Sequence, residues 1–217
     1  MSKNFKLIKK NIDISIFNAE LDTFLKLGGP WSMVRSKDIE VQRETKHIDI
    51  RRCVLGKPMN SLPKKTLLYE ASNSEHHELH FKNYPYFTKT YAYLEKFADE
   101  AGGQLTRAII VSLAPKSRVY PHIDWGNYYI GKDRYHIPIK TTGSINICDG
   151  EQQIYQEGEL WWFDNKKEHE AFNDNNEERV HIIFDVLPKK RNFLKRIEDY
   201  LEKRASCQGR DLRLGAK

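Results

Sequence analysis

The chain has 217 residues, of which 39% are hydrophobic and 30% charged, with a mean hydropathy of −0.70 and a net charge of +6. This length predicts one domain, with enough apolar residues for a sizeable core. No apolar run approaches the roughly 20 residues that a membrane-spanning helix needs, so an integral membrane protein is excluded.

The N-terminal residues and the cysteines indicate in which cellular compartment the protein is expected. Lys9 and Lys10 come before any long apolar stretch, so we expect no signal peptide. Cys53, Cys148 and Cys207 lie far apart without a CxxC pair, which argues against a disulfide framework or a cysteine-based zinc site. We therefore expect a cytoplasmic protein whose metal ligands, if it binds metal, are histidines and carboxylates.

The first hundred residues mix helix and strand. Residues 18–27 predict a short helix that ends at Gly28-Gly29-Pro30, and residues 47–51 alternate like a strand. A second helix is predicted over residues 84–101, where apolar residues recur at helical spacing up to Gly102-Gly103. We expect this mixed part, residues 1–103, to belong to one domain that extends to residue 188.

From residue 104 onward, short strand-like runs follow one another without helices between them. The predicted strands are residues 105–113, 118–122, 134–140, 144–148, 152–155, 159–163, 169–172 and 179–186. Asp149-Gly150 between two of these runs is a specific hairpin signal, because both turn positions need a positive φ. Eight short strands in some 80 residues predict a β-sandwich or barrel, with a core at residues 104–188.

The last 29 residues carry the whole excess of positive charge. Residues 189–217 contain ten Lys or Arg and four acids, and residues 191–204 predict an amphipathic helix. A basic tail can bind nucleic acid by charge alone, but a charge run of this kind is usually a solvated face. We therefore expect no membrane and no nucleic-acid partner, with the tail as the one place where nucleic acid could bind.

Pro121-His122-Ile123-Asp124 offers two metal ligands. Residues two apart in a strand point to the same side, so His122 and Asp124 can meet at one point. A further histidine would complete a group of two histidines and one carboxylate, which leaves three coordination positions open and is typical of non-haem Fe(II) oxygenases. Alone, the H-x-D pattern is weak because it often arises by chance.

His169 is the candidate third ligand, and Arg179 follows ten residues later at the start of an apolar strand. A planar, permanently charged guanidinium is what the far carboxylate of a dicarboxylate such as 2-oxoglutarate requires. His181 is a rival to His169, but the arginine ten residues after it, Arg191, lies in the basic tail. His181 also shares a strand face with Arg179, so we expect it beside the pocket and favour His169 as the ligand.

Arg134 and His136 form a second polar pair with the same spacing. They face one side of their strand, while Ile137 and Ile139 face the other. Burying such a pair inside a barrel is costly unless an anion is bound there. The pair therefore indicates an anion-binding pocket.

Four blocks of the chain, residues 113–124, 134–136, 163–173 and 179–185, stand in an order that resembles the aspartyl/asparaginyl β-hydroxylase family. Members of this family are Fe(II)- and 2-oxoglutarate-dependent dioxygenases with a double-stranded β-helix (jelly-roll) core. The resemblance covers residues 104–188 and implies a mainly β fold with flanking helices. Lys116 departs from the glycine that is usual at this turn, whereas Asp124 is present although some animal members lack this carboxylate.

The resemblance also implies roles for individual residues and the cofactors Fe(II), 2-oxoglutarate and O2. The implied iron ligands are His122, Asp124 and His169. The implied cosubstrate contacts are Arg134, His136 and Arg179. The implied substrate is an aspartyl or asparaginyl group, or a related amino acid, peptide or protein, which is hydroxylated.

The alternative is a jelly-roll (cupin-like) module that binds a metal or ligand without oxygen chemistry. It would explain the three metal ligands. It would not explain Arg179 or the pair of Arg134 and His136, and we therefore prefer the dioxygenase.

Overall fold

The structure, a computed structural model, describes residues 2–33, 37, 40–53, 79–80, 83–124, 129 and 131–188. The predicted helix at residues 191–204 and the basic tail at residues 189–217 lie outside the described residues. No helix in the described part of the chain is long and apolar enough to cross a membrane.

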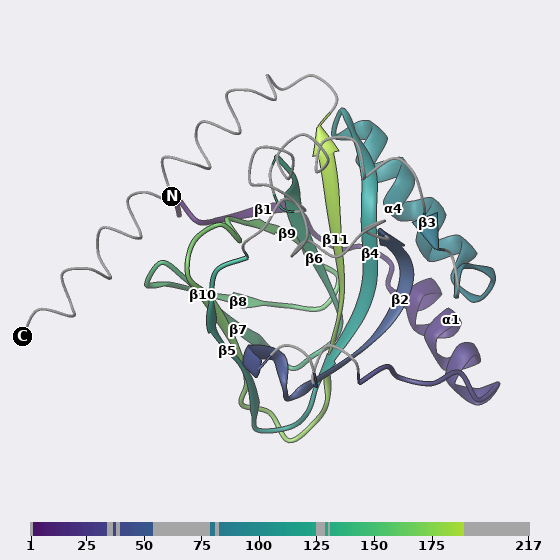
Figure 1. The fold of residues 1–217 in the computed structure, drawn as a ribbon, viewed down its shortest axis with the longest axis horizontal. Coiled ribbons are helices and arrows are strands. Elements are labelled where there is room, and N and C mark those ends of the chain that lie inside the picture. The colour runs from purple at the N-terminus through teal and green to yellow at the C-terminus, as the bar shows by residue number, and fades with distance from the viewer. Residues whose placement is uncertain are drawn as a thin grey trace, which may run out of the picture.

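Two antiparallel sheets form the body of the molecule (Figure 1). The larger has seven strands in the order β1-β9-β6-β11-β4-β2-β3, and the smaller has four in the order β5-β10-β7-β8. The strands of the larger sheet are β1 (Phe5–Lys9), β2 (Thr45–Cys53), β3 (Leu79–His80), β4 (Gly103–Leu113), β6 (Asp133–Lys140), β9 (Leu160–Phe163) and β11 (Arg179–Pro188). Those of the smaller are β5 (Ser117–His122), β7 (Ser144–Cys148), β8 (Glu151–Tyr155) and β10 (His169–Asn173). This arrangement confirms the predicted mainly β, jelly-roll fold with flanking helices.

The helices α1 (Ser15–Lys26) and α4 (Thr88–Glu100) cover the outer face of the larger sheet (Figure 1). Two short 3-10 turns, η1 (Glu40–Gln42) and η4 (Tyr84–Tyr86), precede β2 and α4. Both predicted helices are confirmed, although the second begins with η4 and becomes α-helical only at Thr88.

The main hydrophobic core lies between the helices and the larger sheet. Alternate strand residues such as Ile48, Ile110 and Phe184 point into it, together with Phe17 and Leu94 of the helices. Because neighbouring residues in a strand point to opposite faces, the remaining side chains of the same strands face the smaller sheet. The space between the sheets is therefore lined by both polar and apolar side chains.

Two turns have the backbone conformations that their sequences imply. Asp149 and Gly150, between β7 and β8, have φ of 51° and 79°, which confirms the predicted hairpin. Lys116, between β4 and β5, has φ of 57°. This is the left-handed region that favours glycine, which is the usual residue at this turn in the family that the sequence resembles.

The N-terminal part of the chain contributes strands to the larger sheet. β1 pairs with β9, and β2 pairs with β4. β1 and β3 were not among the predicted strands, whereas all eight strands predicted after residue 104 are present. The predicted division of the domain at residues 103 and 104 stays a prediction.

Candidate active site

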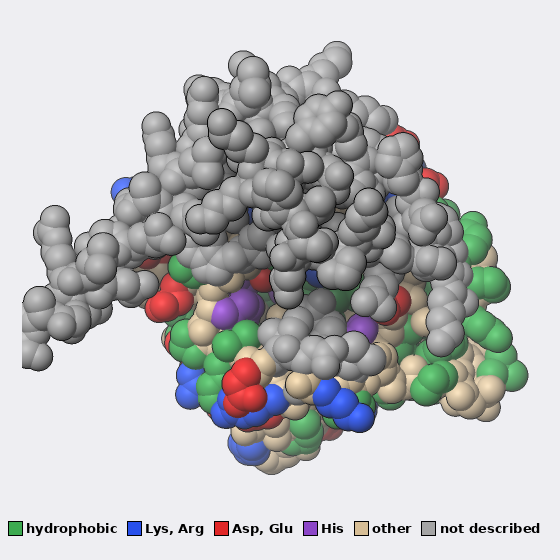
Figure 2. Space-filling model, viewed as in Figure 1, with side chains coloured by type: hydrophobic (Ala, Val, Ile, Leu, Met, Phe, Trp, Pro, Cys, Tyr) green, Lys and Arg blue, Asp and Glu red, His purple; other side chains and the backbone are tan. Residues whose placement is uncertain are grey.

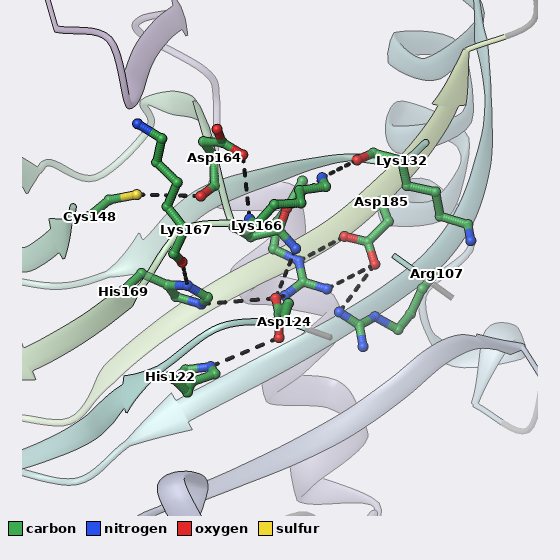
Figure 3. Close-up of polar contacts among 12 residues, drawn as sticks. Arg107, His122, Asp124, Lys132, Cys148, Asp164, Lys166, Lys167, His169 and Asp185 are labelled. Carbon is green, nitrogen blue, oxygen red and sulfur yellow. Dashed lines mark hydrogen bonds and ion pairs between the residues drawn. The ribbon is translucent and has the colours of Figure 1, made fainter. Parts of the chain in front are cut away.

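Two neighbouring strands of the smaller sheet bring the candidate metal ligands together. His122 ends β5 and His169 begins β10, and the two residues are paired directly across the strands. Asp124 follows β5 by two residues, and one possible ligand atom from each of the three side chains lies within 4.8 Å of the others. Both imidazole rings point toward the Asp124 carboxylate (Figure 3). The sequence therefore identified three residues that meet at one point.

Backbone carbonyl groups fix the orientation of both histidines. His122 Nδ1 lies 2.7 Å from the Tyr120 carbonyl oxygen, and His169 Nδ1 lies 2.9 Å from that of Lys167. A carbonyl oxygen only accepts hydrogen bonds, so Nδ1 carries the hydrogen in each ring and Nε2 keeps its lone pair. Each Nε2 lies 3.9 Å from an oxygen of Asp124. Both rings thus turn a nitrogen with a free lone pair, which could bind a metal, toward the carboxylate.

Asp124 is buried but remains ionised. Burial raises the pKa of its carboxyl group, but attraction by the Arg134 guanidinium, with smaller contributions from His169 and Asn165, outweighs this and holds the pKa below its usual range. Asn165 Nδ2 donates to Asp124 Oδ2 at 2.8 Å, and Arg134 donates to the same oxygen. An ionised carboxylate beside two imidazoles suits a divalent transition metal.

Arg134 also forms an ion pair with a second buried carboxylate, that of Asp185 on β11. Its Nε and Nη2 donate to the two oxygens of Asp185 at 2.8 and 3.1 Å. Arg107 of β4 approaches the same carboxylate at 3.1 Å (Figure 3). Two protein carboxylates therefore pair with Arg134, which was predicted from the sequence to lie beside a bound anion.

Arg179 has a different environment. It is 4% exposed, and its guanidinium donates to His181 Nε2 at 3.1 Å and to Asn146 Oδ1 at 3.1 Å. Among the described residues, no carboxylate forms an ion pair with it. Burial lowers the pKa of Arg179 to about 10, so the group is still charged at neutral pH. A buried charge without a counter-ion is costly, which makes this end of the cavity suited to a ligand carboxylate.

One cavity between the two sheets connects these groups. Five of the six predicted site residues line it: His122, Arg134, His136, His169 and Arg179. Burial, reinforced by the charges of Arg179 and Arg134, lowers the pKa of His136 well below its usual value and keeps the ring neutral. The sixth residue, Asp124, contacts Arg134.

Part of the site reaches the surface. The side chains of His122 and His169 are 13% and 10% exposed, so these candidate ligands are not sealed off by the described residues. Figure 2 shows a face of the molecule on which histidine side chains remain visible among hydrophobic and charged ones.

Four residues that contribute to the site were given no role from the sequence: Asn146, Tyr155, Asn165 and Asp185. Asp185 shares the face of Arg179 and His181 along β11, so strand alternation alone could have pointed to it. No comparable signal marks the other three.

A family model covers more than half of the chain. The family model described as "Aspartyl/Asparaginyl beta-hydroxylase" matches residues 64–188. A search of curated proteins finds no match.

Among solved structures, an oxidoreductase of the 2OG-Fe(II) oxygenase family from Burkholderia pseudomallei is similar, with 12% sequence identity and a TM-score of 0.56. The superposition covers 85% of this chain and 84% of the Burkholderia chain. A prolyl-4-hydroxylase from Pseudomonas putida is 9% identical, with a TM-score of 0.46 over 86% of this chain and 93% of the Pseudomonas chain. The first likeness shows a shared fold.

Proposed function

The chain belongs to the aspartyl/asparaginyl β-hydroxylase family and is a 2-oxoglutarate-dependent dioxygenase, and we propose that the cavity between its sheets is the active site. In this proposal His122, Asp124 and His169 hold Fe(II). Support comes from their mutual distances and from the two Nε2 atoms that face the Asp124 carboxylate. Two neutral imidazoles and one carboxylate are a donor set that Fe(II) oxygenases use.

The observation that carries the proposal is Arg179, a buried guanidinium whose partners among the described residues are neutral. Its planar fork binds the distal carboxylate of 2-oxoglutarate, and this carboxylate supplies the missing counter-charge. His136, buried and neutral in the same cavity, lies against the bound cosubstrate. Arg134 holds the Asp124 carboxylate in place and also lines the cavity in which the cosubstrate would bind.

The iron, when bound, supplies the redox chemistry by which O2 and 2-oxoglutarate are converted to one substrate hydroxyl group, succinate and CO2. The residues of the chain orient the ligands, provide the charge that the cosubstrate needs and limit access of water. The substrate is an aspartyl or asparaginyl group, or a related free amino acid, peptide or protein. We place the reaction in the reducing cytoplasm, in keeping with the buried free thiol of Cys148.

The proposed site is tested by anaerobic titration of the Fe(II)-loaded protein with 2-oxoglutarate, monitored by the visible metal-to-ligand charge-transfer band. The wild-type protein should develop the band. His169→Ala should lose it, because one of three ligands is missing. Arg179→Met should require roughly 10- to 100-fold more 2-oxoglutarate, since a charged hydrogen-bond partner of the carboxylate is removed.

A matched control is His47→Ala, which removes a buried histidine of β2 that does not line the cavity. It should leave the band and the titration midpoint unchanged. Metal binding by the wild-type protein without any band would contradict the cosubstrate site. Normal titration of Arg179→Met would contradict the role of that residue.

A further inference from the structure

Tyr155, at the end of β8, carries a hydroxyl group whose position the packing fixes. The residue is fully buried and lines the cavity that holds Arg179. Its ring stacks on that of Trp161, with centroids 4.9 Å apart and an angle of 8° between the planes. The centroids of the His136 and His181 rings each lie 6.1 Å from that of Tyr155. With two torsions and these contacts, the hydroxyl has little freedom to move.

The hydroxyl oxygen of Tyr155 is buried and has no hydrogen-bond partner among the described residues. A buried hydroxyl without a partner is costly, and native structures rarely retain one unless a ligand or water satisfies it. His136 Nε2, in the same cavity, is likewise buried without a described partner. Two unsatisfied polar atoms in one cavity indicate that a polar ligand completes it.

Arg179 provides the neighbouring charge. Both residues line the same cavity, and both contact His181: its ring lies 6.1 Å from that of Tyr155 and accepts a hydrogen bond from Arg179. Burial raises the pKa of Tyr155 well above its usual value, and the Arg179 charge acts on it in the opposite direction. The described partners of Arg179 are the side chains of Asn146 and His181, which carry no negative charge. A carboxylate has about four lone-pair sites and can accept from a guanidinium and a hydroxyl at the same time.

We propose that the Tyr155 hydroxyl donates a hydrogen bond to the distal carboxylate of 2-oxoglutarate beside Arg179, and thereby helps to select a dicarboxylate cosubstrate. This inference rests on the proposed function. A monocarboxylic 2-oxo acid of similar length would leave both the Tyr155 hydroxyl and the Arg179 charge unsatisfied. Tyr155 therefore contributes to discrimination between 2-oxoglutarate and such acids.

The test is Tyr155→Phe, which removes one oxygen and keeps the ring. Binding of 2-oxoglutarate to the anaerobic Fe(II)-loaded protein, measured by calorimetry, should weaken by about 10- to 100-fold, because the lost bond is to a charged group. Binding of 2-oxovalerate, which lacks the distal carboxylate, should change little. Without 2-oxoglutarate, the variant should melt at a higher temperature than the wild type, because an unsatisfied buried hydroxyl has been removed.

The matched control is Tyr91→Phe on α4, whose hydroxyl accepts from Arg51 at 2.8 Å and donates to Glu95 at 3.0 Å outside the cavity. This variant should melt at a lower temperature and bind 2-oxoglutarate like the wild type. The two variants thus have opposite expected effects on stability, and only Tyr155→Phe is expected to weaken binding of 2-oxoglutarate.

Unchanged affinity of Tyr155→Phe for 2-oxoglutarate would overturn the inference while leaving the proposed function intact. A lower melting temperature of the ligand-free variant would also overturn it, because the hydroxyl would then have a partner in the free protein. Absence of 2-oxoglutarate binding by the wild-type protein would instead contradict the proposed function itself.

Discussion

Asp185, which was given no role from the sequence, contacts two buried arginines. It is 1% exposed, pairs across the strands with Arg134, and also meets Arg107. Through Arg134 it acts on Asp124, a candidate metal ligand. Asp185 is therefore a positioning residue, since it fixes the arginine that in turn fixes the ligand.

Asp185→Asn should lower the free energy of unfolding at pH 7 by about 3–5 kcal/mol, because it leaves two buried arginines with too little counter-charge. Burial raises the pKa of Asp185, but Arg107 and Arg134, with a smaller contribution from Lys132, hold it below the usual range. Its contribution is therefore complete above about pH 4 and is lost as the pH falls toward the folded-state pKa. Urea denaturation should show the difference between wild type and variant shrinking by about 1.4 kcal/mol per pH unit below pH 4.

Glu100→Gln provides the comparison for this measurement. It neutralises an exposed carboxylate on α4 that pairs only with the exposed Lys96 in the described part of the chain, so its effect should stay within about 1 kcal/mol. A difference between wild type and Asp185→Asn that is the same at pH 3 and pH 7 would show that Asp185 is not a charged partner of the arginines.

The residue types of the site could be predicted from the sequence, but most of their partners could not. The spacing of Arg134 with His136 follows from strand alternation, which β6 obeys. Asp124 meets His122 although it lies two residues beyond the end of β5, outside the strand that the pattern assumed. Asn146, Tyr155 and Asn165 come from other strands and turns, and their roles depend on how the two sheets face each other. Such contacts between distant segments leave no local pattern in the sequence.

At the scale of elements, α4 begins without a capping side chain of its own. Instead Glu20, from α1, accepts the backbone N–H groups of Lys89 and Thr90 at 2.8 and 2.9 Å and the Thr90 hydroxyl at 2.7 Å. A carboxylate at a helix N-terminus also interacts favourably with the helix dipole. The side chain therefore both starts one helix and joins it to the other.

Glu20→Ala should lower the free energy of unfolding by about 1–2 kcal/mol, the range found for loss of an N-terminal cap. Chemical denaturation followed by circular dichroism measures this difference. Asp22→Asn, on an exposed position of the same helix, should change the stability by less than about 0.5 kcal/mol. Equal effects of the two substitutions would argue against the capping role.

Two local features of the strands differ in how far the sequence predicts them: the turn between β7 and β8, and the bulge in β5. The Asp149-Gly150 turn was predictable because only a few residue types adopt two consecutive positive φ angles. The bulge in β5 was not, although it matters for the site. Val119 faces Ala171 and His122 faces His169, so between these pairs β5 has two residues where β10 has one. This extra residue directs both Val119 and His122 into the cavity.

At the scale of the whole molecule, the two faces of the larger sheet differ in polarity and in what they pack against. One face packs against α1 and α4 in the main hydrophobic core, and the other carries Arg107, Arg134 and Arg179 toward the smaller sheet. The stability of the apolar side offsets the cost of burying several charges on the polar side. The composition, with 39% hydrophobic and 30% charged residues, suits this division.

The N-terminal segment joins the two sheets. Asn4 is 2% exposed; its Nδ2 donates to the Cys148 carbonyl oxygen at 3.2 Å, and Lys167 Nζ donates to its Oδ1 at 2.7 Å. Cys148 ends β7 of the smaller sheet, while β1, which begins next to Asn4, pairs with β9 of the larger sheet (Figure 1). Lys167 lies in the turn before His169, so the Asn4 side chain also supports the segment that leads to a candidate metal ligand.

Asn4→Ala should therefore lower the free energy of unfolding by about 1–3 kcal/mol, because it leaves a buried carbonyl group and a lysine without this partner. Lys6→Ala, an exposed change in β1, should stay within about 0.5 kcal/mol of the wild type in the same urea titration. If the segment mainly joins the sheets, Asn4→Ala should leave the unfolding transition cooperative and shift only its midpoint. A variant as stable as the wild type would show that pairing of β1 with β9 alone holds the segment in place.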